Sequence, residues 1–259
     1  GEPAMGMRAW VSAGGTADVF LAEAPRIRPA ERQDFRLPEF NAPVLCLRTR
    51  GENLQTTFVA VYQLASVNNA VRSVETQQLP SGIWVTVEHA DGRRDDVLVA
   101  RDGVAEESLQ TDIGALRVQA AWALVRSREG VLTSVHIVGG GQVTLAGKSL
   151  AAAPTFEGVV TAWRAEPTPD SAGWIDVPQD IPAVDPGNPL LLTFADGTVR
   201  AFTPTRAERH GQQTRLFVRE KPAFERTDAG LRLTAFPQRD VPGEAPRYVL
   251  YGVTHVQLP

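Results

Sequence analysis

The chain has 259 residues, which is enough for one large β domain or two smaller ones with a core that needs no disulfide or metal. Hydrophobic residues are 43% and charged residues 22% of the chain, as in an ordinary globular protein. The net charge of −4 at pH 7 provides no basic field for nucleic acid or an anionic membrane. No segment reaches the ~20 consecutive apolar residues of a membrane helix. We therefore expect no nucleic acid and no membrane among the partners.

Cysteine usage and the N-terminal residues give little information about the compartment. Cys46 is the one cysteine, so no internal disulfide can form, and we interpret it as a small buried hydrophobe within the apolar run 43–47. The first seven residues lack the charged and apolar regions of a signal peptide. The 26 basic residues include only two lysines, Lys148 and Lys221. Arginine suits a uronate-bearing polymer because it pairs with planar carboxylates, but GC-rich codon usage produces the same composition.

Short apolar runs follow one another along the whole chain, and helical periodicity is nearly absent. Gly, Pro, Asp or Asn interrupts the runs every 8–12 residues or so, a spacing typical of β-sandwiches and barrels. The runs predict strands over residues 7–11, 17–22, 44–49, 56–64, 70–76, 83–88, 96–101, 116–127, 131–138, 142–146, 157–165, 174–177, 190–194, 199–203, 214–218, 231–235 and 248–257. The sequence thus predicts an all-β fold, an antiparallel two-layer β-sandwich with a second, smaller β-sheet unit.

Breaks in the strand pattern indicate how the chain is divided. Residues 24–42 and 166–185 are rich in proline and poor in strands, and the three glycines at 139–141 predict a flexible corner. We place the domain boundary after residue 152. This gives a β-sandwich over 1–152 and a smaller C-terminal β domain over 153–259.

Turn chemistry predicts several hairpins. Asp91-Gly92 and Asp196-Gly197 each stand between two predicted strands, and Asp-Gly is the pair preferred in type I′ turns, which need two positive φ angles. Glu129-Gly130 has a similar pattern. The strand at 56–64 is apolar on both faces, so we expect it to be covered on two sides within a packed double layer.

The residues that most often carry chemistry form no recognisable constellation. The four histidines show no metal-ligand spacing. We expect His89 and His210 in solvated loops, and His136 and His255 as structural residues within strands. No serine or cysteine nucleophile motif occurs. We therefore predict no catalytic residue, no metal site and no cofactor in this chain.

Acidic pairs and tryptophans are the remaining candidates. Asp95 and Asp96 are neighbours in a strand, so they point to opposite faces and cannot act as paired glycosidase carboxylates; a charged edge strand is the simpler interpretation. We expect Glu106-Glu107 in a solvated loop. Among the five tryptophans, we expect Trp84, Trp122 and Trp163 in the core. Trp174, in a proline-rich surrounding, is the one candidate for stacking on a sugar ring.

The order of segments in roughly the first 150 residues resembles the later β region of heparinase II/III-like polysaccharide lyases. The resemblance rests on Met7-Arg8-Ala9-Trp10-Val11, on Asp18-Val19-Phe20-Leu21-Ala22-Glu23-Ala24-Pro25, on Pro43-Val44-Leu45-Cys46-Leu47-Arg48-Thr49-Arg50-Gly51 and on Thr57-Phe58-Val59-Ala60-Val61-Tyr62. Gln63-Leu64 stands where Glu-Pro is usual in the family. The closing region, with Gly158-Val159-Val160 and the Asp196-Gly197 hairpin, is similar to the family's small terminal β domain.

The resemblance implies a lyase that cleaves a uronic-acid-containing polysaccharide, such as a glycosaminoglycan, by β-elimination. Such a reaction neutralises the carboxylate, removes the C5 proton with a base and protonates the departing O4 with an acid. In the family a helical α/α toroid supplies most of these groups, and this sequence has no stretch that could form one. None of its four histidines matches a catalytic or zinc-binding histidine of the family. The resemblance also favours a secreted bacterial protein, periplasmic or extracellular.

Three functional hypotheses follow. The first is the non-catalytic β portion of such a lyase, with a helical catalytic domain or chain and an acidic polysaccharide as partners; it predicts an apolar patch on one sandwich face. The second is a stand-alone carbohydrate-binding module, which predicts an exposed aromatic platform or an arginine-lined groove. The third is a structural or interaction β-sandwich that has neither partner. The first is our prediction.

Overall fold

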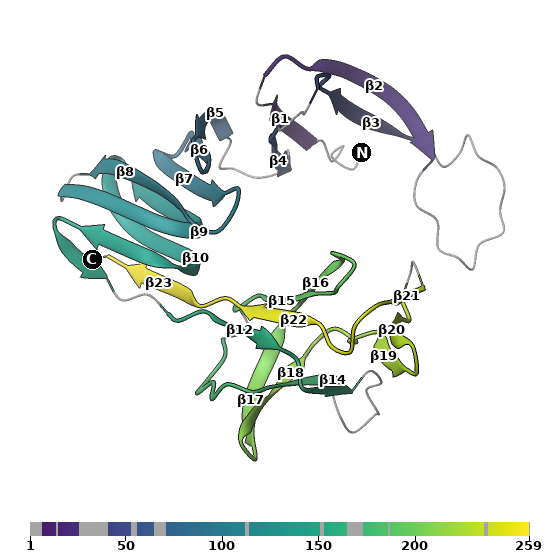
Figure 1. Cartoon of the computed structure of the whole chain (residues 1–259). Helices are drawn as coiled ribbons and strands as arrows, with labels where there is room; N and C mark the ends of the chain where they lie inside the picture. Colours follow the sequence, from purple (N-terminus) through teal and green to yellow (C-terminus); the bar gives the residue numbers. More distant parts are fainter. Residues whose placement is uncertain are drawn as a thin grey trace, which may run out of the picture.

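A computed structural model describes residues 7–13, 15–25, 41–52, 56–64, 71–111, 114–150, 153–164, 173–185, 187–235 and 238–258. These residues form twenty-three strands, and all pairings between strands are antiparallel (Figure 1). The prediction of an all-β, sandwich-type fold is confirmed. Across the described ranges, there is no helix of the length and apolarity that a membrane span requires.

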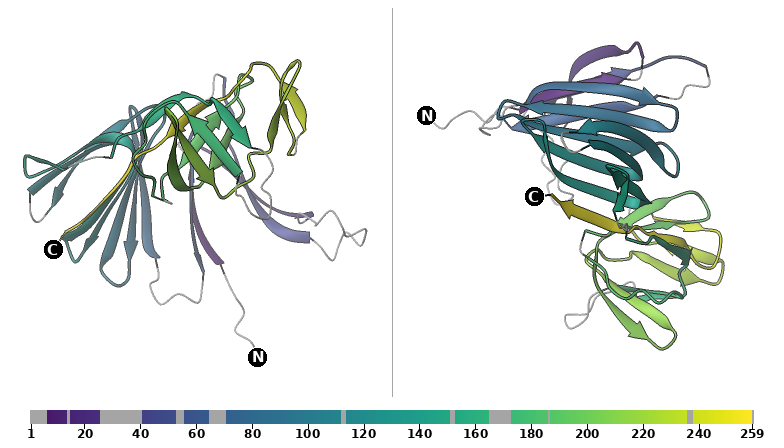
Figure 2. Two further views of the ribbon diagram at one scale, coloured as in Figure 1. Left: turned by 90° about the horizontal axis from the view of Figure 1, so that it is seen from below. Right: turned by 90° about the vertical axis from the view of Figure 1, so that its left-hand side faces the viewer.

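An eight-stranded sheet forms the centre of the first unit. Its order is β11-β10-β9-β7-β6-β5, with β8 added to β9 and β23 added to β10. The strands are β5 (Val71–Leu79), β6 (Gly82–His89), β7 (Arg93–Ala100), β8 (Ala105–Thr111), β9 (Gly114–Arg128), β10 (Val131–Leu145), β11 (Lys148–Leu150) and β23 (Val253–Gln257). The last of these returns from the end of the chain, so the sheet contains one strand from the range 153–259. Figure 2 shows the strong curvature of this sheet.

The curvature accompanies an irregularity in the long strand β10. The pairing of β10 with β9 shifts register between Val138 and Gly141, and Gly139, Gly140 and Gly141 all have positive φ angles. These glycines lie inside a continuous strand as a β-bulge, which bends and twists a sheet. The predicted corner is therefore a built-in bend. Buried side chains from β9, β10 and neighbouring strands pack together as a hydrophobic core. This core includes Leu98, Leu116, Val118, Val125 and Val135.

Two ribbons of two strands each precede this sheet. β1 (Met7–Ala13) pairs with β4 (Phe58–Leu64), and β2 (Asp18–Pro25) pairs with β3 (Asn41–Arg48). One face of the β1–β4 ribbon packs on the sheet through Trp10, Val59 and Val61, against a small cluster that comprises Val71, Ile83, Val85 and Val87.

Two predictions about these ribbons are wrong. The strand at 56–64 is covered on one side only, because its residues alternate between half-buried and exposed. Cys46 is exposed, because the β2–β3 ribbon pairs with no other strand in the described residues and contributes to none of the core clusters found there. Both errors have one cause, since the sequence has the composition of covered strands and the described residues supply no cover for the outer face of β4 or for the β2–β3 ribbon.

The second unit has its own core between two four-stranded sheets. One sheet has the order β12-β22-β15-β16 and the other β13-β14-β18-β17, with a three-stranded sheet β19-β20-β21 beside them. Leu190, Leu192 and Tyr248 on the first sheet face the same core as Ile175 and Leu216 on the second. The strands are β12 (Phe156–Val159), β13 (Ala162–Arg164), β14 (Gly173–Val177), β15 (Leu190–Thr193), β16 (Val199–Phe202), β17 (Pro204–His210), β18 (Gln213–Val218), β19 (Phe224–Thr227), β20 (Gly230–Leu233), β21 (Arg239–Val241) and β22 (Arg247–Leu250).

The predicted hairpins are present, but their turn types differ from the prediction. Gly92 and Gly197 have positive φ angles, whereas the aspartate before each does not, so the Asp-Gly turns are not of type I′. Each aspartate instead accepts a hydrogen bond from a backbone N–H two residues ahead. Glu129 and Gly130, between β9 and β10, both have positive φ angles, as a type I′ turn requires.

Candidate functional site

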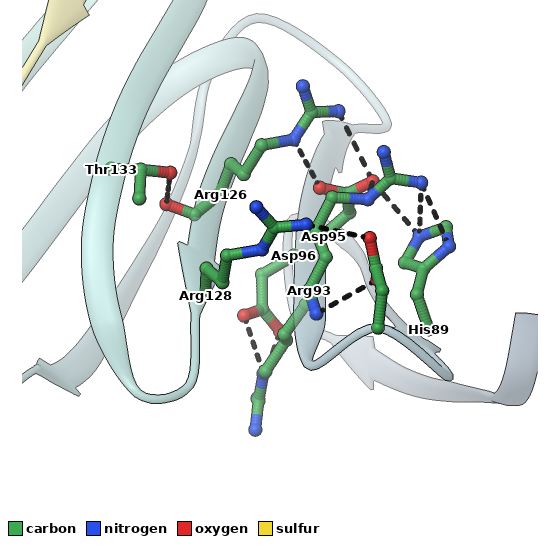
Figure 3. A network of polar contacts seen from close by, with 9 residues as sticks. His89, Arg93, Asp95, Asp96, Arg126, Arg128 and Thr133 are labelled. Atoms are coloured by element: carbon green, nitrogen blue, oxygen red, sulfur yellow. Dashed lines mark hydrogen bonds and ion pairs between the residues drawn. The ribbon is translucent and has the colours of Figure 1, made fainter. Parts of the chain in front are cut away.

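The richest polar site lies where two hairpin turns meet at one end of the eight-stranded sheet. β7 pairs with both β6 and β9, so the β6–β7 turn lies beside the β9–β10 turn. The backbone N–H of Glu129 in one turn donates a 2.9 Å hydrogen bond to the carbonyl of Gly92 in the other. Side chains from three strands and the β6–β7 turn converge here, and we call this group the turn-end network; its members are His89, Asp91, Arg93, Arg94, Asp95, Asp96, Arg126 and Arg128 (Figure 3).

Asp95 is the centre of the network on one face of the sheet. Arg126 on β9 donates hydrogen bonds to both of its oxygens, at 2.7 and 3.3 Å, and Arg93 Nε lies 3.6 Å from Oδ2. The pKa of Arg126 is raised, chiefly because of its hydrogen bond to Asp95. The carboxylate is thus neutralised by structural partners and is not placed to act as a free base.

His89 lies at the end of β6 and is 8% exposed, so the prediction of a solvated loop histidine is wrong. The register explains the burial: the ring stands beside Asp95, whose Oδ2 is 3.2 Å from Nε2, and Arg93 Nη2 is 2.9 Å from Nδ1. Both ring nitrogens therefore have partners within the protein. A histidine held this way has a structural role and no free nitrogen for proton transfer.

Asp96 points to the opposite face from Asp95, as predicted from strand geometry. It is 3% exposed, and its oxygens accept hydrogen bonds from Trp84 Nε1 (3.1 Å), Thr86 Oγ1 (2.6 Å) and Arg94, whose Nε and Nη2 lie at 2.7 and 3.0 Å. The pKa of Arg94 is raised, chiefly by these hydrogen bonds. The interpretation of this segment as a charged edge strand is wrong, because β7 is internal, between β6 and β9.

Two cavities open beside the turn-end network. The first, of about 310 Å³, is lined by Arg72, Arg93, Arg94, Glu88 and the hairpin-turn residues Ser127 and Gly130, among others. The second, of about 150 Å³, shares Arg94, Ser127 and Gly130 with the first and continues to Gln110 and Thr111 on β8. The two cavities share three lining residues and therefore adjoin each other at this end of the sheet; together we call them the groove. Strand prediction alone could not find it, since its arginines come from two strands, β5 and β7, that are not paired with each other.

A second polar contact joins the last strand to the sheet. His136 on β10 and His255 on β23 are directly opposite in register, and their rings stack with centroids 3.8 Å apart and planes inclined by 11°. The pKa of His136 is lowered, first by desolvation, then by His255 and Arg126. Both histidines lie in strands, as predicted, but their contact depends on the pairing of β10 with β23, which no sequence pattern predicted.

This pair predicts a pH dependence of stability. Because the pKa of folded His136 lies below its unfolded value of about 6.5, the unfolded chain takes up a proton first as the pH falls. The free energy of unfolding should therefore decrease as the pH falls below about 6.5, until folded His136 is itself protonated. The variant His136→Phe keeps a flat ring in the stack and should remove this part of the decrease. Urea unfolding of both proteins between pH 7 and 5 measures it; equal slopes for the two would contradict the assignment.

Trp174, the predicted sugar-stacking residue, lies on β14 in the second unit, far along the chain from the turn-end network. Its side chain is half-buried, and the Arg215 guanidinium lies over the indole, 3.6 Å from the ring centroid. Arg215 is in turn fixed by two 2.8 Å hydrogen bonds to the buried Asp176. A sugar ring could use only what this cation–π pair leaves free. The stacking role of Trp174 stays a prediction.

The other sequence candidates do not add to a site. Glu106 and Glu107 lie in the strand β8 rather than in a loop, and Glu106 is ion-paired with Arg117 on β9. His210 ends the strand β17 and is exposed, as predicted, although not in a loop. Trp84 is buried as predicted, whereas Trp122 and Trp163 are only half-buried. No group of three or more potential metal ligands occurs within the described ranges.

Comparison with known proteins gives no relatives: no family model, no curated protein and no solved structure matches this chain. The function therefore has to be argued from the molecule itself.

Proposed function

We propose that this chain is the non-catalytic β-sandwich portion of a polysaccharide lyase that cleaves uronic-acid-containing polysaccharide by β-elimination, and that it supports a helical catalytic domain. The observation that carries the proposal is the exposed apolar surface of the two N-terminal ribbons. Fourteen large apolar side chains are exposed among the described residues. Nine of them belong to the four strands of the two ribbons, namely Met7, Val11, Val19, Phe20, Leu21, Leu45, Phe58, Tyr62 and Leu64. Contiguous apolar surface of this kind marks an interaction site.

The β1–β4 ribbon has an apolar outer face. In its register Met7 is opposite Leu64, and Tyr62 lies between Leu64 and Phe58 on the same face. Arg8, on the inner face, is opposite Gln63. The inner face also carries Trp10, Val59 and Val61, which pack on the sheet, so the ribbon has apolar residues on both faces. A ribbon with one face in water has polar residues on that face, so the apolar outer face is built to be covered.

The β2–β3 ribbon is apolar on both faces. Val19 and Leu21 lie on one face with Leu45, while Phe20 lies on the other, opposite Cys46. Leu21 is 78% exposed and Val19 is 61% exposed. An isolated two-stranded ribbon is at most marginally stable in water, so a partner that covers it would contribute to its folding.

An apolar stripe of a helix is the common cover for such a sheet face, since helices and sheets bury their apolar sides against each other. The resemblance to heparinase II/III-like lyases implies a helical catalytic domain as that cover. The turn-end network has no free proton-transfer group, which favours a non-catalytic role for the described part of this chain.

A charge in this surface tests the proposal. Tyr62→Asp should weaken association with the helical catalytic domain at least about tenfold, because it removes apolar contact area and buries a charge. Native mass spectrometry of the coexpressed proteins measures the fraction in complex. Val199→Asp is the matched control, because Val199 is 55% exposed, against 63% for Tyr62, and lies on β16 in the second unit.

Two results would refute the proposal. One is β-elimination of a uronate polymer by this polypeptide alone, measured as the absorbance of the unsaturated product. The other is equal complex formation by wild type, Tyr62→Asp and Val199→Asp. If the chain forms a homodimer that dissociates in Tyr62→Asp, and no helical chain binds, the surface serves self-association instead.

A further inference from the structure

The groove beside the turn-end network has an excess of positive charge in a protein of net charge −4. Arg72, Arg93 and Arg94 line its larger cavity, and Glu88 is the one acidic residue of that lining. His89, which also lines it, has both ring nitrogens engaged. The three arginines come from β5 and β7, so the sheet itself brings them together.

The arginines differ in what they already bind. Arg94 is fixed by the buried Asp96, and Arg93 reaches His89 through its Nη2. Arg72 is exposed, and within the described part of the chain it has no hydrogen-bonded or ion-paired partner. A guanidinium that is held by a structural carboxylate is preorganised, because its free N–H groups point in a defined direction. The groove therefore combines two fixed guanidinium groups with one that is free to close on a ligand.

From this arrangement we infer that the groove binds the anionic groups of an acidic oligosaccharide, with Arg72 and Arg94 as donors to a carboxylate or sulfate. Guanidinium groups recognise planar oxyanions through paired, charge-assisted hydrogen bonds. The second cavity extends the groove past Ser127 to Gln110 and Thr111, whose hydroxyl and amide groups suit neighbouring sugar hydroxyls. The choice of a saccharide as carrier of the anion rests on the proposed function; the preference for an anion rests on the arginines.

Titration calorimetry on the isolated chain tests this site. The probes are an unsulfated oligouronate, the same oligosaccharide with its carboxyl groups reduced to alcohols, and a sulfated glycosaminoglycan oligosaccharide. We expect heat with one or both anionic probes and none with the reduced one, and weaker binding at higher salt. Which anionic probe binds more tightly distinguishes carboxylate from sulfate recognition. No heat with either anionic probe would overturn the inference.

The variant Arg72→Glu should lower the affinity at least about tenfold, because it replaces a donor to the anion with a like charge. Arg232→Glu on β20 is the matched control, since it makes the same change of two charges on an exposed arginine of the second unit. Equal loss in both variants would show a bulk charge effect and overturn the site, as would loss in Trp174→Ala with unchanged binding by Arg72→Glu.

Failure of this site and failure of the proposed function give different results. If no anion binds but the helical domain still docks, only the inference about the groove is refuted. If anions bind but no helical domain docks, the inference about the groove stands and the proposed lyase role is refuted.

Discussion

Replacing Asp96 with alanine is expected to lower the free energy of unfolding by about 2–4 kcal/mol, because Trp84 and Thr86 lose a buried acceptor, while the ion pair with the half-exposed Arg94 adds little. The carboxylate accepts hydrogen bonds from Trp84 and Thr86 as well as two from Arg94. Alanine would leave the indole N–H, the hydroxyl and a guanidinium without their acceptor at a position that is 3% exposed. Each buried donor left without an acceptor costs its full desolvation free energy.

Urea unfolding at pH 7 measures this effect, and two variants interpret it. Asp96→Asn keeps one carbonyl acceptor and should cost less than Asp96→Ala. Glu106→Ala removes an ion pair with Arg117 in which both side chains are largely exposed, and should cost less than about 1 kcal/mol. If Asp96→Ala is no more costly than Glu106→Ala, the network around Asp96 does not stabilise the sheet.

Strand order and turn chemistry made much of the first unit predictable. The sequence pattern predicted 83–88 and 116–127 within one residue or two of β6 and β9. β9 alternates between a buried and a wetter face, whereas β6 is a short apolar run that is buried on both faces along most of its length. β8 was missed: Glu106 and Glu107 look like loop residues, and only their pairing with Gln119 and Val118 on β9 makes them a strand. Propensity yields to such pairing because cross-strand contacts decide much of strand stability.

The turn-end network was beyond sequence reasoning for a different reason. Asp95 and Arg126 are 31 residues apart, and their contact depends on the register of β7 with β9. The pairing of β6 with β7 likewise places His89 beside Asp95 and turns an expected loop residue into a buried one. A one-residue slip would reverse every side chain between the two faces, so contacts of this kind follow only from the assembled sheet.

The N-terminal ribbons show a case in which the sequence is informative about a surface that the described residues do not cover. The two apolar faces of β4 predicted cover on both sides, and one face has it while the other is exposed. Cys46 gives the same result on β3. The residues at 56–64 are consistent with a covered strand, so the error lay in assuming that the described part of the chain covers both of its faces. This is the physical basis for proposing a docked domain.

Gly141→Ala should be among the most damaging single substitutions outside the core, lowering the free energy of unfolding by at least about 3 kcal/mol. Its φ angle is +121°, and a Cβ there would lie 1.8 Å from the Gln119 carbonyl oxygen on β9. Since that oxygen belongs to the partner strand's backbone, the bulge cannot relax without moving the sheet. Gly147→Ala is the matched control: its φ is +78°, but no atom lies within 4 Å of the added methyl group.

The control should therefore cost only the strain of a left-handed residue, about 1–2 kcal/mol. The difference between the two variants isolates the close approach of β10 to β9 at the bulge. Thermal or urea unfolding of both variants under one condition measures it. The bulge accompanies the bend that gathers β8 to β10 around one core. If both glycine variants lost the same free energy of unfolding, the strands would not approach closely at this point. The bend would then need another cause.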